Sequence, residues 1–197
     1  CGVLQVLDQF IFSEQNLAFG AVLASAVNDW QLETWCRPEP RLKGSILVGQ
    51  EDAEAAVAEI ERRAEDPNFL QINVSSRALE PLGRRRYWPI YAAAQATRRP
   101  IGIHVGGYGG HPPTGSGWPS FYAEEHHSNA HTMQAQLASL VIEGVLEHYP
   151  GLRFVFIEGG FGWVPAVAWR LDRHFERFRD EVPHLKRRPS EYIRDHF

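Results

Sequence analysis

One histidine and one glutamate stand out because each follows a short apolar segment and directly precedes a glycine-containing turn. His104 lies in PIGIHVGG, residues 100–107, and Glu158 lies in FVFIEGGFGWVP, residues 154–165. In parallel α/β proteins ligands bind at the carboxyl ends of the strands, where loops carry the reactive groups. A neutral imidazole at such a position can bind a divalent metal, and a carboxylate can act as a general base. These positions make His104 a candidate metal ligand and Glu158 a candidate catalytic residue.

Both residues also have structural interpretations. His104 can be a buried histidine bonded to a backbone carbonyl, because a single histidine does not make a metal site. Glu158 can form a structural salt bridge with Arg153 or Arg170, or serve as a metal ligand or an orienting hydrogen-bond partner. The spacing of the residues leaves these alternatives open.

Alternation along the strand before Glu158 gives a further expectation. If Val155 and Ile157 face the surrounding helices, then Phe154, Phe156 and Glu158 point the other way, into the interior. Glu158 then faces His104 across the mouth of the site.

A segment rich in glycine and histidine follows His104. Five of the nine histidines of the chain lie within residues 104–131, and residues 106–128 are predicted to form one long loop. Long loops inside a compact domain are uncommon and tend to be functional. We expect this loop to cover the cleft, with Tyr108 and His111 binding substrate, whereas a solvated surface role is expected for His126 and His127.

Short apolar segments and longer amphipathic ones alternate along the chain. Five strands are predicted, at residues 3–7, 44–48, 69–74, 101–105 and 154–157. Helices are predicted at residues 16–35, 51–64, 89–97 and 129–148 and from Pro165 onward. Such alternation requires parallel strands joined by right-handed crossovers, as in a (β/α)8 barrel or an open doubly wound sheet. A whole barrel takes about 250 residues, so 197 residues favour a partial barrel in one domain spanning residues 1–197.

Composition excludes several classes of protein. A net charge of −4 gives no basic surface for nucleic acid, and no apolar run approaches the length of a membrane span. Cys1 and Cys36 lack CxxC spacing, so a reducing, cytoplasmic location is expected. P-loop, GxSxG and HExxH motifs are absent from the sequence, and HVGGYGG runs into two prolines rather than into a helix.

Several motifs together resemble the amidohydrolase-related family, the metal-dependent TIM-barrel enzymes of the aminocarboxymuconate-semialdehyde decarboxylase type. The most specific motif is VFIEGGFGWVPAVAWRLDR at residues 155–173. The others are AVNDW at 26–30, RLKGSILV at 41–48, PLGRRRYWPIY at 81–91, PIGIHVGG at 100–107 and SFYAEEH at 120–126. The resemblance covers nearly the whole chain.

The resemblance implies a specific set of metal ligands. In that family an HxH pair on the first strand, a histidine on the fifth and an aspartate on the eighth hold the metal. Only the fifth-strand histidine has a counterpart here, His104, so the strands present would be the second to the sixth. The chain also begins within an apolar pattern, and no closing element is predicted in the final PSEYIRDHF, so we expect a fragment that by itself is inactive. One departure is clear: decarboxylases of the family carry a catalytic histidine at the end of the sixth strand, where this chain has Glu158.

The leading hypothesis is a metal-dependent enzyme, with zinc as the expected ion, that hydrolyses or decarboxylates a small carboxylate-bearing or aromatic substrate. Arg84 or Arg86 could hold a substrate carboxylate, although a solvated role is expected for each. The alternative is a non-catalytic barrel that binds a small carboxylate or a partner. The sequence leaves homo-oligomerisation open.

Overall fold

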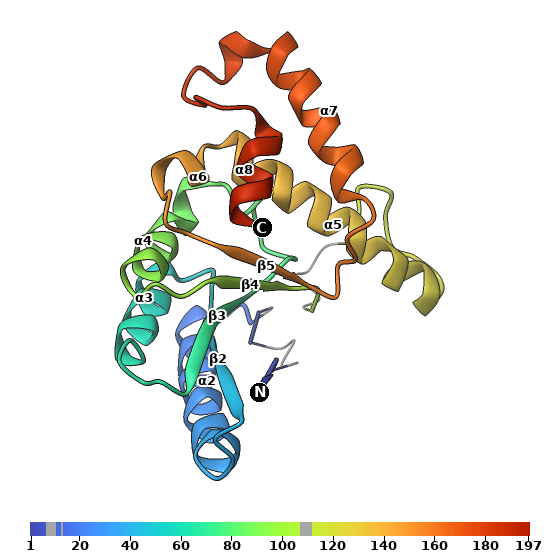
Figure 1. The fold of residues 1–197 in the computed structure, drawn as a ribbon. Coiled ribbons are helices and arrows are strands. Elements are labelled where there is room, and N and C mark those ends of the chain that lie inside the picture. Colours follow the sequence, from blue (N-terminus) through green and yellow to red (C-terminus); the bar gives the residue numbers. More distant parts are fainter. Residues whose placement is uncertain (7–10, 13, 107–111) are drawn as a thin grey trace.

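A computed structural model of the chain describes residues 1–6, 11–12, 14–106 and 112–197. Within them, five strands form one parallel sheet in the order β1-β2-β3-β4-β5. The strands are β1 (Gly2–Val3), β2 (Leu42–Leu47), β3 (Phe69–Ser75), β4 (Ile101–His104) and β5 (Phe154–Ile157). The sheet curls into a half-barrel, so the prediction of a partial (β/α) barrel is confirmed (Figure 1). All five predicted strands are present, with boundaries that shift by a few residues.

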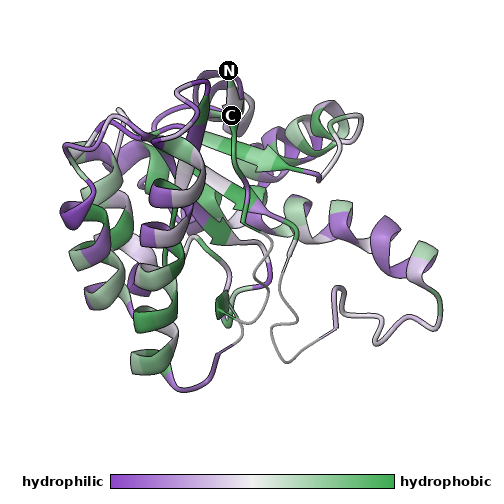
Figure 2. Cartoon of the chain, turned by 90° about the horizontal axis from the view of Figure 1, so that it is seen from below, coloured by the Kyte–Doolittle hydropathy of each residue, from purple (hydrophilic) through white to green (hydrophobic). Residues whose placement is uncertain are grey.

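Helices connect the strands and cover the outer face of the sheet (Figure 1). The α-helices are α2 (Leu17–Gln31), α3 (Ala53–Arg62), α4 (Trp88–Ala96), α5 (Tyr122–Ile142), α6 (Val145–His148), α7 (Val164–Arg177) and α8 (Pro189–His196). Short π or 3-10 turns are η1 (Leu32–Cys36), η2 (Arg85–Tyr87) and η3 (Arg179–Glu181). Hydrophobic residues concentrate on the strands, whereas the helices alternate hydrophilic and hydrophobic faces (Figure 2). None of the described helices is long and apolar enough to cross a membrane.

Two expectations about the helices are wrong. Helix α5 begins at Tyr122, so the last seven residues of the predicted loop, among them His126 and His127, are helical. The segment PSEYIRDHF contains α8, in which Tyr192, Ile193 and His196 are buried. The buried residues of α8 are spaced as on one face of a helix. This face packs against α5 and α7, although the segment as a whole is polar in composition.

The alternation predicted for β5 is also wrong. Phe154 stacks on Phe197 with ring centroids 5.3 Å apart and contacts Tyr91 of α4, while Phe156 contacts Trp163 and Phe197. The two phenylalanines therefore face the helices, where aromatic rings cover them. Ile157 faces inward with Gly102, since a Cβ built on Gly102 would lie 2.9 Å from Ile157 Cδ1.

The inner face of the sheet is partly polar. Gln71 Nε2 donates to Ser45 Oγ at 2.9 Å, and Ser45 Oγ donates to the Leu4 carbonyl at 2.7 Å. Asn73 is fully buried, and within the described part of the chain neither of its amide atoms has a hydrogen-bond partner. The outer face, by contrast, is apolar: Ile46, Ile72, Ile101 and Ile103 are all fully buried in the main core. The hydrophobic core therefore lies between sheet and helices.

Side-chain amides continue the backbone pairing where a strand has ended. Asn28 of α2 accepts from Leu47 N at 2.9 Å and donates to the Leu47 carbonyl at 2.8 Å, beyond the last residue of β1. Gln50 bonds Ser75 in the same two-point manner, beyond the end of β2. Buried backbone groups need partners, so these amides stabilise the carboxyl edge of the sheet.

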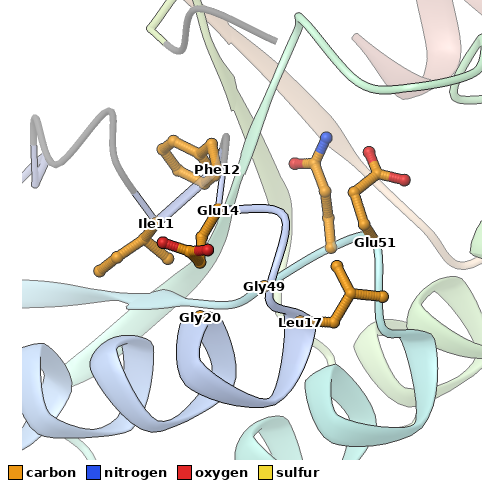
Figure 3. Close-up of a pocket in the computed structure, with 8 residues that line it drawn as sticks. Ile11, Phe12, Glu14, Leu17, Gly20, Gly49 and Glu51 are labelled. Carbon is orange, nitrogen blue, oxygen red and sulfur yellow. The ribbon is translucent and has the colours of Figure 1, made fainter. Parts of the chain in front are cut away.

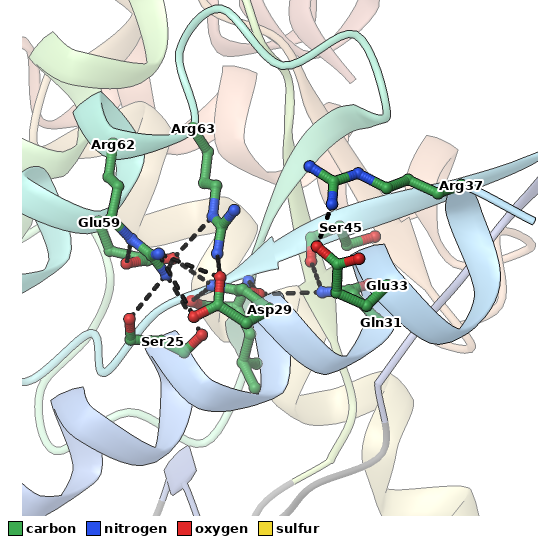
Figure 4. Close-up of polar contacts among 11 residues, drawn as sticks. Ser25, Asp29, Gln31, Glu33, Arg37, Ser45, Glu59, Arg62 and Arg63 are labelled. Carbon is green, nitrogen blue, oxygen red and sulfur yellow. Dashed lines mark hydrogen bonds and ion pairs between the residues drawn. The ribbon is translucent and has the colours of Figure 1, made fainter.

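A polar network joins α2 to α3 around Asn28. Its amide nitrogen also donates to Glu59 Oε1 at 2.9 Å, and Glu59 pairs with Arg62 and Arg63, both of which reach Asp29 (Figure 4). Burial alone would raise the pKa of Asp29, but hydrogen bonds and charge from Arg63 and Arg62 lower it overall.

We predict that Asn28→Ala lowers the free energy of unfolding by about 3 kcal/mol, because it leaves the Leu47 N–H and carbonyl and Glu59 without this partner. Urea denaturation measures the change. Asn16→Ala is the matched control: Asn16 caps the exposed start of α2, accepting from Phe19 N at 3.2 Å, and its loss costs about 1 kcal/mol. Equal losses in the two variants would contradict the role of Asn28.

Candidate functional site

His104 is the last residue of β4, the fourth strand of the sheet. In register it pairs with Ser75 of β3 on one side and Ile157 of β5 on the other. Ile101 and Ile103 face the helical core, so alternation directs Gly102 and His104 to the inner face. His104 therefore emerges on the inner face at the carboxyl edge of the sheet, as the sequence predicts.

The imidazole of His104 is buried and only partly satisfied. The residue is 2% exposed, and Nδ1 accepts a hydrogen bond from Gly106 N at 3.0 Å. Nε2 is buried and has no hydrogen-bond partner among the described residues. Burial lowers the pKa of His104, and the negative charge of Glu158 opposes this shift. An imidazole with a lowered pKa is neutral at neutral pH, which is the form that binds metals.

Glu158 approaches this nitrogen from the turn after β5. Its Oε2 lies 3.7 Å from His104 Nε2, and its side chain is 55% exposed while that of His104 is 3% exposed. The predicted proximity of the two side chains is therefore present, although the alternation used to predict it is reversed. The reason is the backbone of Glu158, whose φ of 64° is left-handed and turns the side chain out of the strand's alternation.

Two glycines make this turn possible. A Cβ on Gly159 would lie 2.5 Å from Met133 Cγ of α5, so only glycine fits between the turn and the helix. Gly160 has a φ of 67°, and Trp163 Nε1 donates to the Gly159 carbonyl at 2.8 Å, which closes the turn. The motif EGGFGW thus encodes a tight turn that presents a carboxylate to His104.

The other predicted site residues are not brought to this position. Tyr108 and His111 lie outside the described residues. His127 contacts His131 on α5 with ring centroids 5.2 Å apart, and both are exposed. The clustering of histidines in the sequence is therefore in part a property of the exposed start of α5.

A buried arginine at the same edge of the sheet was missed by sequence reasoning. Arg77 follows β3 by two residues and is 4% exposed. Arg84 and Arg86, which the sequence offered as carboxylate ligands, instead form ion pairs with Glu80 at 3.4 and 3.0 Å. The signal that could have found Arg77 is its position directly after a predicted strand, as for His104 and Glu158.

A separate cavity lies beyond the end of β2, near Gly49 and Glu51 (Figure 3). Its volume is about 10 Å³, which is room for about one water molecule. Glu51 accepts from Tyr87 Oη at 2.9 Å and from Leu79 N at 2.9 Å, so its carboxylate holds neighbouring loops together. This cavity is too small for a substrate.

The His104 environment fits one ligand of a divalent metal. The buried Nε2 has no hydrogen-bond partner among the described residues and is a candidate metal ligand, with a carboxylate oxygen of Glu158 nearby. Since Gly106 N–H donates to Nδ1, the neutral ring carries its proton on Nε2, so coordination there requires the other tautomer and release of the Gly106 bond. Among the described residues, no group of three or more His, Cys, Asp or Glu side chains is arranged to hold a metal.

The family model described as amidohydrolase matches residues 8–197. The chain belongs to this amidohydrolase family. No curated protein matches it. Among solved structures, it resembles an amidohydrolase from Mycobacterium avium subsp. paratuberculosis K-10, with a TM-score of 0.77 at 21% identity. The match covers 92% of this chain and 48% of that structure.

Two decarboxylase structures share the same fold. A 2,6-dihydroxybenzoate decarboxylase from Rhizobium matches with a TM-score of 0.77 at 19% identity. The match covers 99% of this chain and 62% of the decarboxylase. A 5-carboxyvanillate decarboxylase from Novosphingobium aromaticivorans, complexed with manganese and 4-hydroxy-3-methoxy-5-nitrobenzoic acid, has a TM-score of 0.78 at 20% identity. That match covers 98% of this chain and 56% of the decarboxylase. The 197-residue chain thus spans only 48% to 62% of the length of these three solved proteins.

We predict that Glu158→Gly raises the free energy of unfolding by about 1 kcal/mol, because glycine adopts a positive φ without strain. Chemical denaturation tests this. Glu158→Ala removes the same carboxylate but keeps the strain, so it should bring no gain. Arg98→Gly is a control away from the site at the other described non-glycine residue with positive φ, 54°, and should bring a similar gain. Equal stability of the glycine and alanine variants at position 158 would refute the strain.

Proposed function

We propose that this chain supplies part of the active site of a metal-dependent enzyme that hydrolyses or decarboxylates a small carboxylate-bearing or aromatic substrate. The observation that carries the proposal is the buried Nε2 of His104, which lies without a hydrogen-bond partner in the described structure, 3.7 Å from the Glu158 carboxylate. The solved decarboxylases of the same fold, one of them with bound manganese, support a divalent metal and an aromatic acid as substrate. Zinc, which the sequence favoured, remains a prediction.

His104 would hold the metal through Nε2. A divalent ion, when bound, supplies Lewis-acid polarisation of a substrate oxygen. The burial that lowers the pKa of His104 keeps the ring neutral and therefore available as a ligand at neutral pH. The strand position fixes the direction of the ring, because Ser75 and Ile157 flank His104 in register.

Glu158 would exchange a proton with the reacting group at Oε2. Its carboxylate stands beside His104 and is half-exposed, so water and substrate can both reach it. In hydrolysis its carboxylate would accept a proton from the attacking water. In decarboxylation its protonated form would deliver the proton to the carbon from which carbon dioxide leaves. Glu158 Oε2 would thus act as a general base in hydrolysis and as a general acid in decarboxylation.

Metal analysis of the complete natural polypeptide tests the ligand assignment. We expect about one divalent ion per chain in the wild type and at least about tenfold less in His104→Ala after dialysis, because removal of a ligand weakens coordination. His174→Ala, on outer helix α7, is the matched control and should retain the metal. Wild-type metal content in His104→Ala would overturn the assignment, whereas a wild type that holds no metal would favour a barrel that binds small carboxylates without one.

A second test separates proton transfer from metal binding. Glu158→Gln should lower kcat by about 10²- to 10⁴-fold while metal content stays at the wild-type level. Release of carbon dioxide from 2,6-dihydroxybenzoate and hydrolysis of aryl esters and amides serve as the two assays. An unchanged kcat in whichever assay is active would remove Glu158 from the chemistry.

A further inference from the structure

Arg77 lies on the same edge of the sheet as His104. Ser75, two residues before it, is the register partner of His104, and Ser76 N donates to the His104 carbonyl at 2.8 Å. Two residues span at most about 7 Å, so the backbone of Arg77 remains close to the mouth of the site.

The backbone around Arg77 is fixed from two sides. Arg77 N donates to Ser75 Oγ at 3.0 Å, and Gln136 of α5 donates to the Ser76 carbonyl at 2.6 Å. Gln136 also accepts from Leu82 N at 2.7 Å, which anchors the following loop to the same helix. Arg77 is thus presented by a rigid segment rather than by a loose loop.

The guanidinium of Arg77 is enclosed but lies beside exposed groups. The side chain is 4% exposed, and the Trp118 ring centroid lies 5.8 Å from its Cζ. Nη1 lies 3.4 Å from Glu125 Oε1, on the first turn of α5, where the glutamate side chain is 31% exposed. Charge-assisted bonds of arginine are usually about 2.7–2.9 Å long, so this contact leaves room for a tighter one.

A structural arginine pair in the same chain looks different. Arg63 and Glu59 are both less than 10% exposed and belong to one helical segment, four residues apart. Arg77 and Glu125 are 48 residues apart in the sequence, and only the arginine is buried. Glu125 is partly exposed and lies in the first turn of α5. Its carboxylate can therefore move away from the buried guanidinium at low cost in free energy, provided that another anion takes its place.

We propose that Arg77 binds the carboxylate of the substrate, and that Glu125 occupies the place of this carboxylate when no substrate is present. The proposal rests on the function proposed above and names the group that orients the substrate. The planar fork of the guanidinium suits a carboxylate, which can accept two parallel hydrogen bonds. Exchange of one carboxylate for another keeps the buried charge compensated throughout.

Trp118 favours an aromatic acid over an aliphatic one. Its ring already faces the guanidinium and is 61% exposed, so a planar ring attached to the bound carboxylate can cover it. A substrate held in this way would lie at the edge of the sheet where Ser75 and Ser76, just before Arg77, neighbour His104.

Benzoate binding tests the exchange, using complete protein that has been freed of metal with a chelator and then desalted. In isothermal titration calorimetry, Glu125→Gln should bind benzoate about fivefold more tightly than the wild type, because the internal competitor has lost its charge. Glu124→Gln is the matched control: Glu124 lies next to it but accepts from Ser120 N at 3.1 Å, so its affinity for benzoate should not change. Equal affinities of the two variants would overturn the proposal.

Arg77→Met should weaken benzoate binding at least about tenfold, and Arg77→Lys should restore part of the loss, since lysine keeps the charge but not the fork. Wild-type affinity in Arg77→Met would also overturn the proposal. If Arg77→Met does not fold, as judged by near-UV circular dichroism, the comparison of Glu125→Gln with Glu124→Gln still decides.

Metal content separates this proposal from the function on which it rests. Arg77→Met and Glu125→Gln should keep the wild-type metal content, whereas His104→Ala should not. A wild type that holds no metal but shows the predicted benzoate affinities would refute the metal centre and leave the carboxylate site in place.

Discussion

The carboxyl edge of the sheet depends on keeping unequal parallel strands fully hydrogen-bonded. A strand that continues beyond its neighbour leaves N–H and carbonyl groups without partners, which is costly when they are buried. The side-chain amide of Asn28 bonds the N–H and the carbonyl of Leu47, and that of Gln50 bonds the same two groups of Ser75. Because Ser75 pairs with His104 in register, Gln50 also helps to fix the level at which the histidine emerges. The edge that carries the candidate site is therefore positioned in part by side chains other than His104 and Glu158.

Much of this fold could be predicted from the spacing of apolar residues. Five strands were expected and five are present, because buried strands of a parallel sheet consist of short, nearly continuous apolar runs. The start of α5 could not be predicted in the same way. Its first turn, around Glu124 and Glu125, is exposed and polar, so no apolar stripe marks it. Helix α8 was missed for a related reason, since its buried face consists of only four residues, Pro189, Tyr192, Ile193 and His196.

The candidate site was predicted in position but not in geometry. Glycine after a predicted strand placed His104 and Glu158 at strand ends, where the structure has them. The alternation of β5, however, depends on which side of the strand offers partners for its aromatic residues. Phe154 and Phe156 pack against rings from α4 and from the end of the chain, and these partners are distant in sequence. The inward position at the end of β5 therefore belongs to Ile157, and Glu158 reaches His104 only through its left-handed backbone. Local strain of this kind persists where surrounding contacts impose it, here the contact of Gly159 with α5.

Burial explains why one arginine is suited to the site and others are not. Side chains of Arg84 and Arg86 are 55% and 37% exposed, so water screens their charges and their ion pairs contribute little. Arg77 is enclosed, and a charge in a poorly hydrated place attracts a counter-charge far more strongly than one in water. The same burial acts in the opposite sense on His104, because it lowers the pKa of the imidazole and keeps it neutral. One edge of the sheet thus carries a permanent cation, Arg77, two residues after β3 and an uncharged imidazole, His104, at the end of β4. This difference is the physical basis for proposing an anion at the first and a metal at the second.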